Sequence, residues 1–64
     1  MTASTYNYIG NANKLEGNET KALEWYKKAF AICEKVLGAE NQLTLKINNN
    51  IVDIISSVIM INKL

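Results

Sequence analysis

The stretch from residue 18 to residue 38 constrains the fold of this chain more than any other part of the sequence. Its apolar side chains recur at helical spacing and form a single stripe of six residues: Ala22, Tyr26, Ala29, Phe30, Cys33 and Leu37. Asn18 is a residue type that caps helix starts, and Gly38 is one that ends helices. The stretch therefore predicts one long amphipathic helix near residues 19–37, against which the flanking segments pack.

The segment before it carries a second helical pattern. Tyr6, Ile9 and Asn13 share one face of a helix predicted near residues 3–16. Gly17 and the following asparagine are typical of a tight turn. Because so short a connection leaves no room for a crossover, the two helices are predicted to be antiparallel neighbours.

The segment after the long helix predicts a third helix near residues 43–61. The preceding loop is short and polar, and Asn41 or Thr44 can cap the helix that follows. One apolar stripe has these members: Ile47, Ile51, Ile54, Ile55, Val58 and either Ile61 or Asn62. A second apolar set, Val52, Ile59 and Met60, lies off that stripe. The many β-branched residues leave a strand as the alternative. The sequence predicts an all-α fold, with residues 1–64 forming one domain.

The first two segments together carry a recognisable motif. It reads Tyr6-x-x-Ile9-Gly10-x-x-Asn13, followed by Ala22-x-x-x-Tyr26. This motif resembles the tetratricopeptide signature W-x-x-L-G-x-x-Y…A-x-x-x-F. The later Val36-Leu37-Gly38 and Asn49-Asn50-Ile51 resemble the longer repeat variant found in kinesin light chains. The pattern departs from the signature at Asn13, which takes the place of an aromatic residue, and in the absence of proline.

The resemblance implies a helical hairpin plus one trailing helix, which is about one and a half repeats. It places Gly10 opposite Ala22 where the first two helices cross, and Ala29 where the next repeat approaches. A shift of 42 residues supports this register, since it pairs Asn7 with Asn49 and Ile9 with Ile51. An unrelated helical hairpin with the same spacing is the alternative.

The composition argues against several classes of function. The chain has no histidine and a single Cys33, so neither an internal disulfide nor a protein-only zinc site is expected. It has no glycine-rich phosphate loop and no evident catalytic base, and we expect no enzyme activity and no cofactor. The net charge of +1 argues against a nucleic-acid partner. The apolar run over residues 51–61 is too short to span a membrane.

The N-terminus also lacks the charged start and apolar run of a signal peptide. Together with the lone cysteine, this predicts a cytoplasmic protein.

The resemblance implies that the first and third helices line a groove that binds an extended peptide or a partner helix. The residues that point into it would be Asn7, Asn11, Lys14, Asn49, Asn50 and Asp53. Side-chain amides suit such a groove because each offers a donor and an acceptor to a peptide backbone. Asn11 and Asn50 match two asparagines of the family's carboxylate clamp, but Asn7 stands where the clamp has a basic residue, so carboxylate capture is in doubt. A bias of the whole composition toward asparagine is the alternative.

The apolar excess of the third helix predicts self-association. A hairpin of two helices covers only one side of the third, so the uncovered side is expected to pair with a second copy in a dimer. The predicted contact residues are Ile51, Ile54, Ile55, Val58, Ile59 and Ile61. Trp25 lies off the main stripe and is expected either to anchor a partner or to contact the next helix. A structural, self-associating unit without a client, or a fragment of a longer array, is thus the alternative function.

Overall fold

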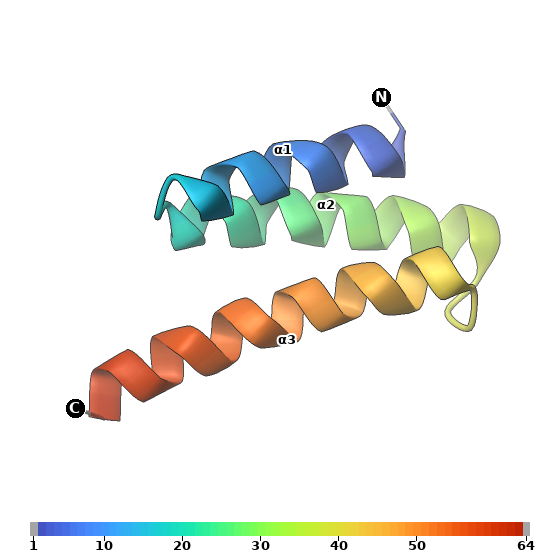
Figure 1. Ribbon diagram of the computed structural model, residues 1–64. Coiled ribbons are helices and arrows are strands. Elements are labelled where there is room, and N and C mark those ends of the chain that lie inside the picture. The colour runs from blue at the N-terminus through green and yellow to red at the C-terminus, as the bar shows by residue number, and fades with distance from the viewer. Residues whose placement is uncertain (1, 64) are drawn as a thin grey trace.

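The computed structural model consists of three α-helices in the described part of the chain, and the all-α prediction is confirmed (Figure 1). The structure describes residues 2–63, with side chains described through residue 60. Helix α1 spans Ala3–Leu15, α2 spans Glu19–Leu37 and α3 spans Gln42–Lys63. The helix over Gln42–Lys63 rules out the strand alternative for the third segment. Helix α2 lies between α1 and α3, so it is packed on two sides (Figure 1).

Two glycines at positive φ direct the chain from one helix to the next. Gly17 has φ +81° and connects α1 to α2, while Gly38 has φ +93° and follows the last residue of α2. This backbone region costs side-chain-bearing residues energy but is open to glycine. The backbone N–H of Gly38 donates to the Glu34 carbonyl at 3.1 Å, which closes the last turn of α2. Both glycines therefore act as the sequence predicts.

The helix starts differ from the prediction in one case. Asn18 occupies the residue before α2, but its side chain makes no capping hydrogen bond, so the expected side-chain cap is wrong. Asn41, before α3, does cap, because its Oδ1 accepts from the backbone N–H of Leu43 at 3.0 Å. Thr44 is buried inside the first turn, where its hydroxyl donates to the Gly38 carbonyl at 2.8 Å.

The core consists of two small clusters arranged along α2. The first contains Ala3, Ala29, Cys33 and Ile47, and the second contains Ala22, Tyr26 and Ile54. Ile51 is half-buried and packs against both clusters. Each cluster includes residues of α2 and α3, so the long central helix joins the whole core, and Ala29 meets the third helix as predicted.

Helices α1 and α2 approach each other closely at Gly10. A Cβ at this position would lie 2.7 Å from two atoms of the Tyr26 ring, closer than real Cβ contacts. Glycine is needed here because the aromatic ring occupies the space of a side chain. The predicted partner, Ala22, is fully buried, but the ring of Tyr26 and not Ala22 lies nearest to Gly10.

Helix α3 is buried on one face only. Ile47 and Ile54 are almost fully buried against α2. Through residue 60, the exposed large apolar residues of α3 are Leu45, Val52, Ile55, Val58, Ile59 and Met60. The C-terminal end of α3 projects beyond the start of α2, where the hairpin does not cover it (Figure 1).

Candidate interaction site

Two asparagines bring α1 and α3 together on one side of the molecule. Asn7 is buried, with 8% of its surface exposed, and its Oδ1 accepts a hydrogen bond from Nδ2 of Asn50 at 3.1 Å. Forty-three residues separate the two in sequence. The bond joins helices that otherwise have few contacts, so part of the predicted groove set forms an inter-helix bridge.

A buried phenol lies next to this bridge. The Tyr26 hydroxyl donates to Oδ1 of Asn11, which connects α2 to α1. Burial raises the pKa of Tyr26 above its usual value, and the negative charge of Asp53 on α3 raises this pKa further. Tyr26 thus belongs to the polar site although the sequence predicted it only as a core residue. The sequence feature that could have indicated this polar role is the hydroxyl itself, because the repeat signature has phenylalanine at this position.

The six predicted groove residues divide into two groups. Asn7, Asn11 and Asn50 are buried or half-buried and hydrogen-bonded, and together with Tyr26 we call them the polar cluster. Lys14, Asn49 and Asp53 are exposed, and no hydrogen bond of their side chains is recorded within the described residues. The polar cluster is therefore the part of the predicted groove set that hydrogen bonds hold in place.

Trp25 has a different contact from the one predicted. Its ring stacks on that of Tyr6 in α1, with centroids 5.5 Å apart and planes inclined by 22°. The Lys28 ammonium lies 4.7 Å from the centroid of the indole. The stacking stabilises the hairpin, and the cation–π contact, which lies within α2, stabilises that helix. The expected contact with the next helix is replaced by this stacking on α1.

The structure changes the composition of the predicted self-association surface. Ile54 is only 1% exposed and belongs to the core of its own chain, so it cannot contribute to such a surface. Ile51 is half-buried, whereas Ile55, Val58 and Ile59 are exposed. The side chain of Ile61 lies outside the described residues.

Two residues that the prediction omitted extend the exposed apolar surface. Leu45 and Val52 are each half-exposed, and with Ile59 they recur every seven residues along α3. Residues with this spacing lie along one side of a helix, and Ile55 lies beside them. We call these four residues, Leu45, Val52, Ile55 and Ile59, the outer stripe of α3.

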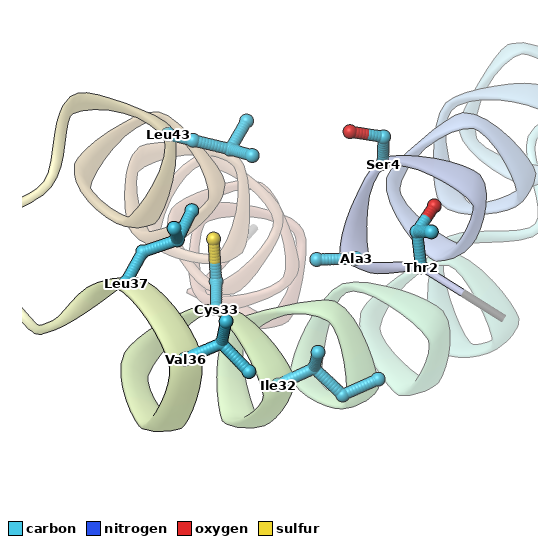
Figure 2. Close-up of a pocket in the computed structure, with 8 residues that line it drawn as sticks. All are labelled: Thr2, Ala3, Ser4, Ile32, Cys33, Val36, Leu37 and Leu43. Atoms are coloured by element: carbon cyan, nitrogen blue, oxygen red, sulfur yellow. The ribbon is translucent and has the colours of Figure 1, made fainter.

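A cavity of about 300 Å³ lies elsewhere, where the last turns of α2 run past the start of α1. Its lining is mostly apolar and comprises Thr2, Ala3, Ser4, Ile32, Cys33, Val36, Leu37 and Leu43. Figure 2 shows Cys33, Ala3 and Leu43 pointing toward one another across this space. The thiol of Cys33 is buried in the floor, as expected of a member of the apolar stripe of the long helix.

The described residues offer neither a metal-ligand cluster nor a helix that could span a membrane. They contain no group of three or more acidic, histidine or cysteine side chains that could hold a metal ion. None of the helices within these residues is long and apolar enough to cross a membrane.

The fold defines the class of protein. Successive helices pack as antiparallel neighbours, with glycine and alanine at the close approaches, which is the architecture of a helical repeat. Comparison with protein families gives the particular family. Residues 2–42, more than half of the chain, match the model described as tetratricopeptide repeat. The chain belongs to the tetratricopeptide repeat family, whose repeats are in general protein-interaction modules.

The matched region covers α1, α2 and the first residue of α3. No curated protein and no solved structure matches the chain with significance.

Proposed function

We propose that this chain is a protein-interaction module that binds an extended peptide or a partner helix on the face formed by α1 and α3. In this proposal residues 1–64 form one unit of about one and a half repeats, with α3 as the first helix of the second repeat. The observation that carries the proposal is the hydrogen bond between Asn7 and Asn50. It brings amides from two helices to one place, where a ligand can contact both.

The chemistry of this face suits a protein ligand. Asn11 and Asn50 are half-buried, so they keep hydrogen-bonding atoms accessible while their positions are held by neighbours. Amide groups of this kind match the alternating donors and acceptors of a peptide backbone. The net charge of +1 favours such a ligand over a nucleic acid. A reducing compartment such as the cytoplasm suits the free Cys33 thiol.

The test is a peptide-binding screen followed by three variants. Asn11→Ala and Asn50→Ala should each weaken binding by about 0.5–1.5 kcal/mol, the usual contribution of one hydrogen bond. Asn48→Ala is the matched control, because Asn48 is exposed and two residues from Asn50, which places it on another side of α3. Peptides that shift backbone signals only on the exposed face of α2 would argue against the α1–α3 site.

A second candidate function is self-association through α3, and the exposed outer stripe is the observation that favours it. Its four side chains are 41–50% exposed. Burying the exposed half of each, at about 1.5–3 kcal/mol for a whole side chain, yields roughly 6–12 kcal/mol for eight side chains in a two-fold dimer. Association itself costs about 4–15 kcal/mol. These opposing terms are similar in size, so we expect a weak dimer that dissociates on dilution.

Light scattering coupled to size exclusion tests this candidate across the micromolar range. The apparent mass should rise with concentration above the monomer mass of 7.2 kDa. Ile55→Lys and Ile59→Lys should keep the chain monomeric, while Ser57→Lys, which adds the same charge on the opposite side of α3, should not. A constant mass of one chain at every concentration would contradict self-association.

A further inference from the structure

The hydroxyl of Tyr26 determines which half of the Asn11 amide remains available. An asparagine amide has one oxygen that accepts and one nitrogen that donates. In this structure the oxygen, Oδ1, accepts from the buried Tyr26 hydroxyl. No hydrogen bond of Nδ2 is recorded within the described residues. Asn11 is only half-buried, so a ligand can reach it. Its Nδ2 is then the group that can donate to that ligand.

Asn50 on α3 is held by the opposite end of its amide, the nitrogen. Nδ2 of Asn50 donates to Asn7, which leaves the Oδ1 of Asn50 as its accessible acceptor. Asp53, three residues later on the same side of α3, adds an exposed carboxylate, whose charge also acts on Tyr26. The α1 side of the face thus offers a donor, and the α3 side offers acceptors.

We propose that Tyr26 is a positioning residue that fixes Asn11 as a hydrogen-bond donor, so that the α1–α3 face selects a neutral amide over a carboxylate. The amide can be a peptide bond or an asparagine or glutamine side chain. Its carbonyl accepts from Nδ2 of Asn11, and its N–H donates to Oδ1 of Asn50. The inference rests on the proposed peptide-binding function and adds the chemical class of the bound group.

A carboxylate fits this arrangement poorly because it only accepts hydrogen bonds. It would satisfy Nδ2 of Asn11 but would bring its charge toward Oδ1 of Asn50, which also only accepts. The nearest cations along the two helices are Lys14 and Lys46, and both are exposed to solvent. Asp53 is exposed as well, and water and salt screen the fields of all three groups, so the preference depends on the hydrogen-bonding atoms.

The experiment compares acetamide with acetate, two probes of the same shape that differ in the amide group. Each is titrated in the millimolar range, which such small ligands require, into the whole isotope-labelled chain. Nuclear magnetic resonance follows the side-chain amide signals of Asn7, Asn11 and Asn50. Acetamide should shift the Asn11 and Asn50 signals several-fold more than acetate at equal concentration.

Three variants separate positioning from folding. Tyr26→Phe keeps the buried ring but frees Oδ1 of Asn11, and it should bring the shifts caused by the two probes to near equality. Asn11→Asp retains an acceptor for Tyr26 but removes the donor to the probe carbonyl, and it should reduce the acetamide shift at the Asn50 signal several-fold without altering the buried ring. Tyr8→Phe removes a hydroxyl that is exposed on α1, and it should leave the preference unchanged.

The possible results separate the role of Tyr26 from the proposed peptide-binding function. Equal or larger shifts with acetate, or an unchanged preference in a folded Tyr26→Phe variant, would overturn the role of Tyr26 while peptide binding could stand. Failure of both probes to shift any of the three amide signals would count against the α1–α3 binding face and the inference together.

Discussion

Helices α2 and α3 are similar in length and both are amphipathic, yet they are packed very differently. Helix α2 lies between two neighbours, and the four residues it buries, Ala22, Tyr26, Ala29 and Cys33, all belong to one stripe. Helix α3 contacts α2 along one side, and among its side chains described through residue 60 six large apolar ones are substantially exposed. The central helix thus has its apolar surface matched to its neighbours, whereas α3 has more apolar surface than this chain covers.

The difference shows that the apolar content of a helix does not reveal how much of it is buried. In α3 two adjacent isoleucines differ in burial: Ile54 belongs to the core, whereas Ile55 is 41% exposed. A helix turns about 100° per residue, so one apolar neighbour faces α2 and the next faces away. Four predictions probe this contrast, in order of decreasing effect.

The largest effect is expected from truncating the packed side of α3. Ile54→Ala should destabilise the chain by about 2–5 kcal/mol, because it leaves a cavity beside Ala22 and Tyr26. The same substitution at Ile59, which is 48% exposed, should cost less than about 1.5 kcal/mol. Denaturant unfolding followed by circular dichroism at low protein concentration measures both. Equal losses at the two positions would mean that the outer stripe is covered in solution and would erase the contrast between the two sides.

The second prediction tests the tight side of the molecule, where α1 meets α2. Gly10→Ala should destabilise by about 1–3 kcal/mol through overpacking against the Tyr26 ring, less a gain of about 1 kcal/mol in helix propensity. The net effect should remain a loss, visible as a lower melting temperature.

The double variant Gly10→Ala with Tyr26→Leu serves as the control for this contact. With the ring removed, adding the methyl group should be neutral or stabilising relative to Tyr26→Leu alone. A stabilising Gly10→Ala in the original background would show that the helices are farther apart than the structure places them.

The sequence predicted the three helices because the signals for them are local. Apolar spacing marks each helix, and the φ values of Gly17 and Gly38 follow from the freedom that only glycine has. Which of Ile54 and Ile55 enters the core could not be predicted, since both belong to one broad apolar face. That choice depends on how α3 is rotated against α2, which is a tertiary property.

The candidate site was predicted in part for the same reason. Asn7, Asn11 and Asn50 were selected by resemblance, and the structure brings these three into one polar cluster. The 42-residue register pairs Asn7 with Asn49, but the structure bonds Asn7 to Asn50 and leaves Asn49 exposed. A shift of one residue turns a helical side chain through about 100°, so periodicity identified the helix but not the bonded residue. The Tyr26 hydroxyl could be assigned to the site only once the structure showed its hydrogen-bond partner, Asn11.

The third prediction concerns Tyr26, where the hairpin meets α3. Its pKa is raised by burial and by Asp53, so the folded state favours the protonated phenol. A raised pKa contributes stability that is fully present below the unfolded pKa, near 10, and is lost as the pH rises through the folded pKa. The stability of the unmutated chain should therefore fall above about pH 10, no more steeply than about 1.4 kcal/mol per pH unit for one phenol.

Comparison with two phenylalanine variants separates the effect of the Tyr26 phenol on stability from that of the lysines, which also titrate at alkaline pH. Tyr26→Phe should flatten the alkaline decline measured by urea unfolding, whereas Tyr8→Phe, at an exposed position, should leave it unchanged. Parallel declines in all three proteins would show that the phenol of Tyr26 is as solvated as that of Tyr8.

The smallest effect is expected at the helix starts, where α2 and α3 differ again. Both are preceded by asparagine, but only Asn41 accepts a capping hydrogen bond, from Leu43, while the Asn18 side chain makes none. Asn41→Ala should thus cost about 1 kcal/mol, the usual value of an N-cap. Asn18→Ala should cost only a few tenths of a kcal/mol, the size expected of a surface substitution.

Helix α2 can dispense with a side-chain cap because packing on two sides holds its start, while α3, packed on one side, depends more on its cap. Unfolding curves of the two variants under one set of conditions decide the matter, and a larger loss for Asn18→Ala than for Asn41→Ala would reverse this assignment.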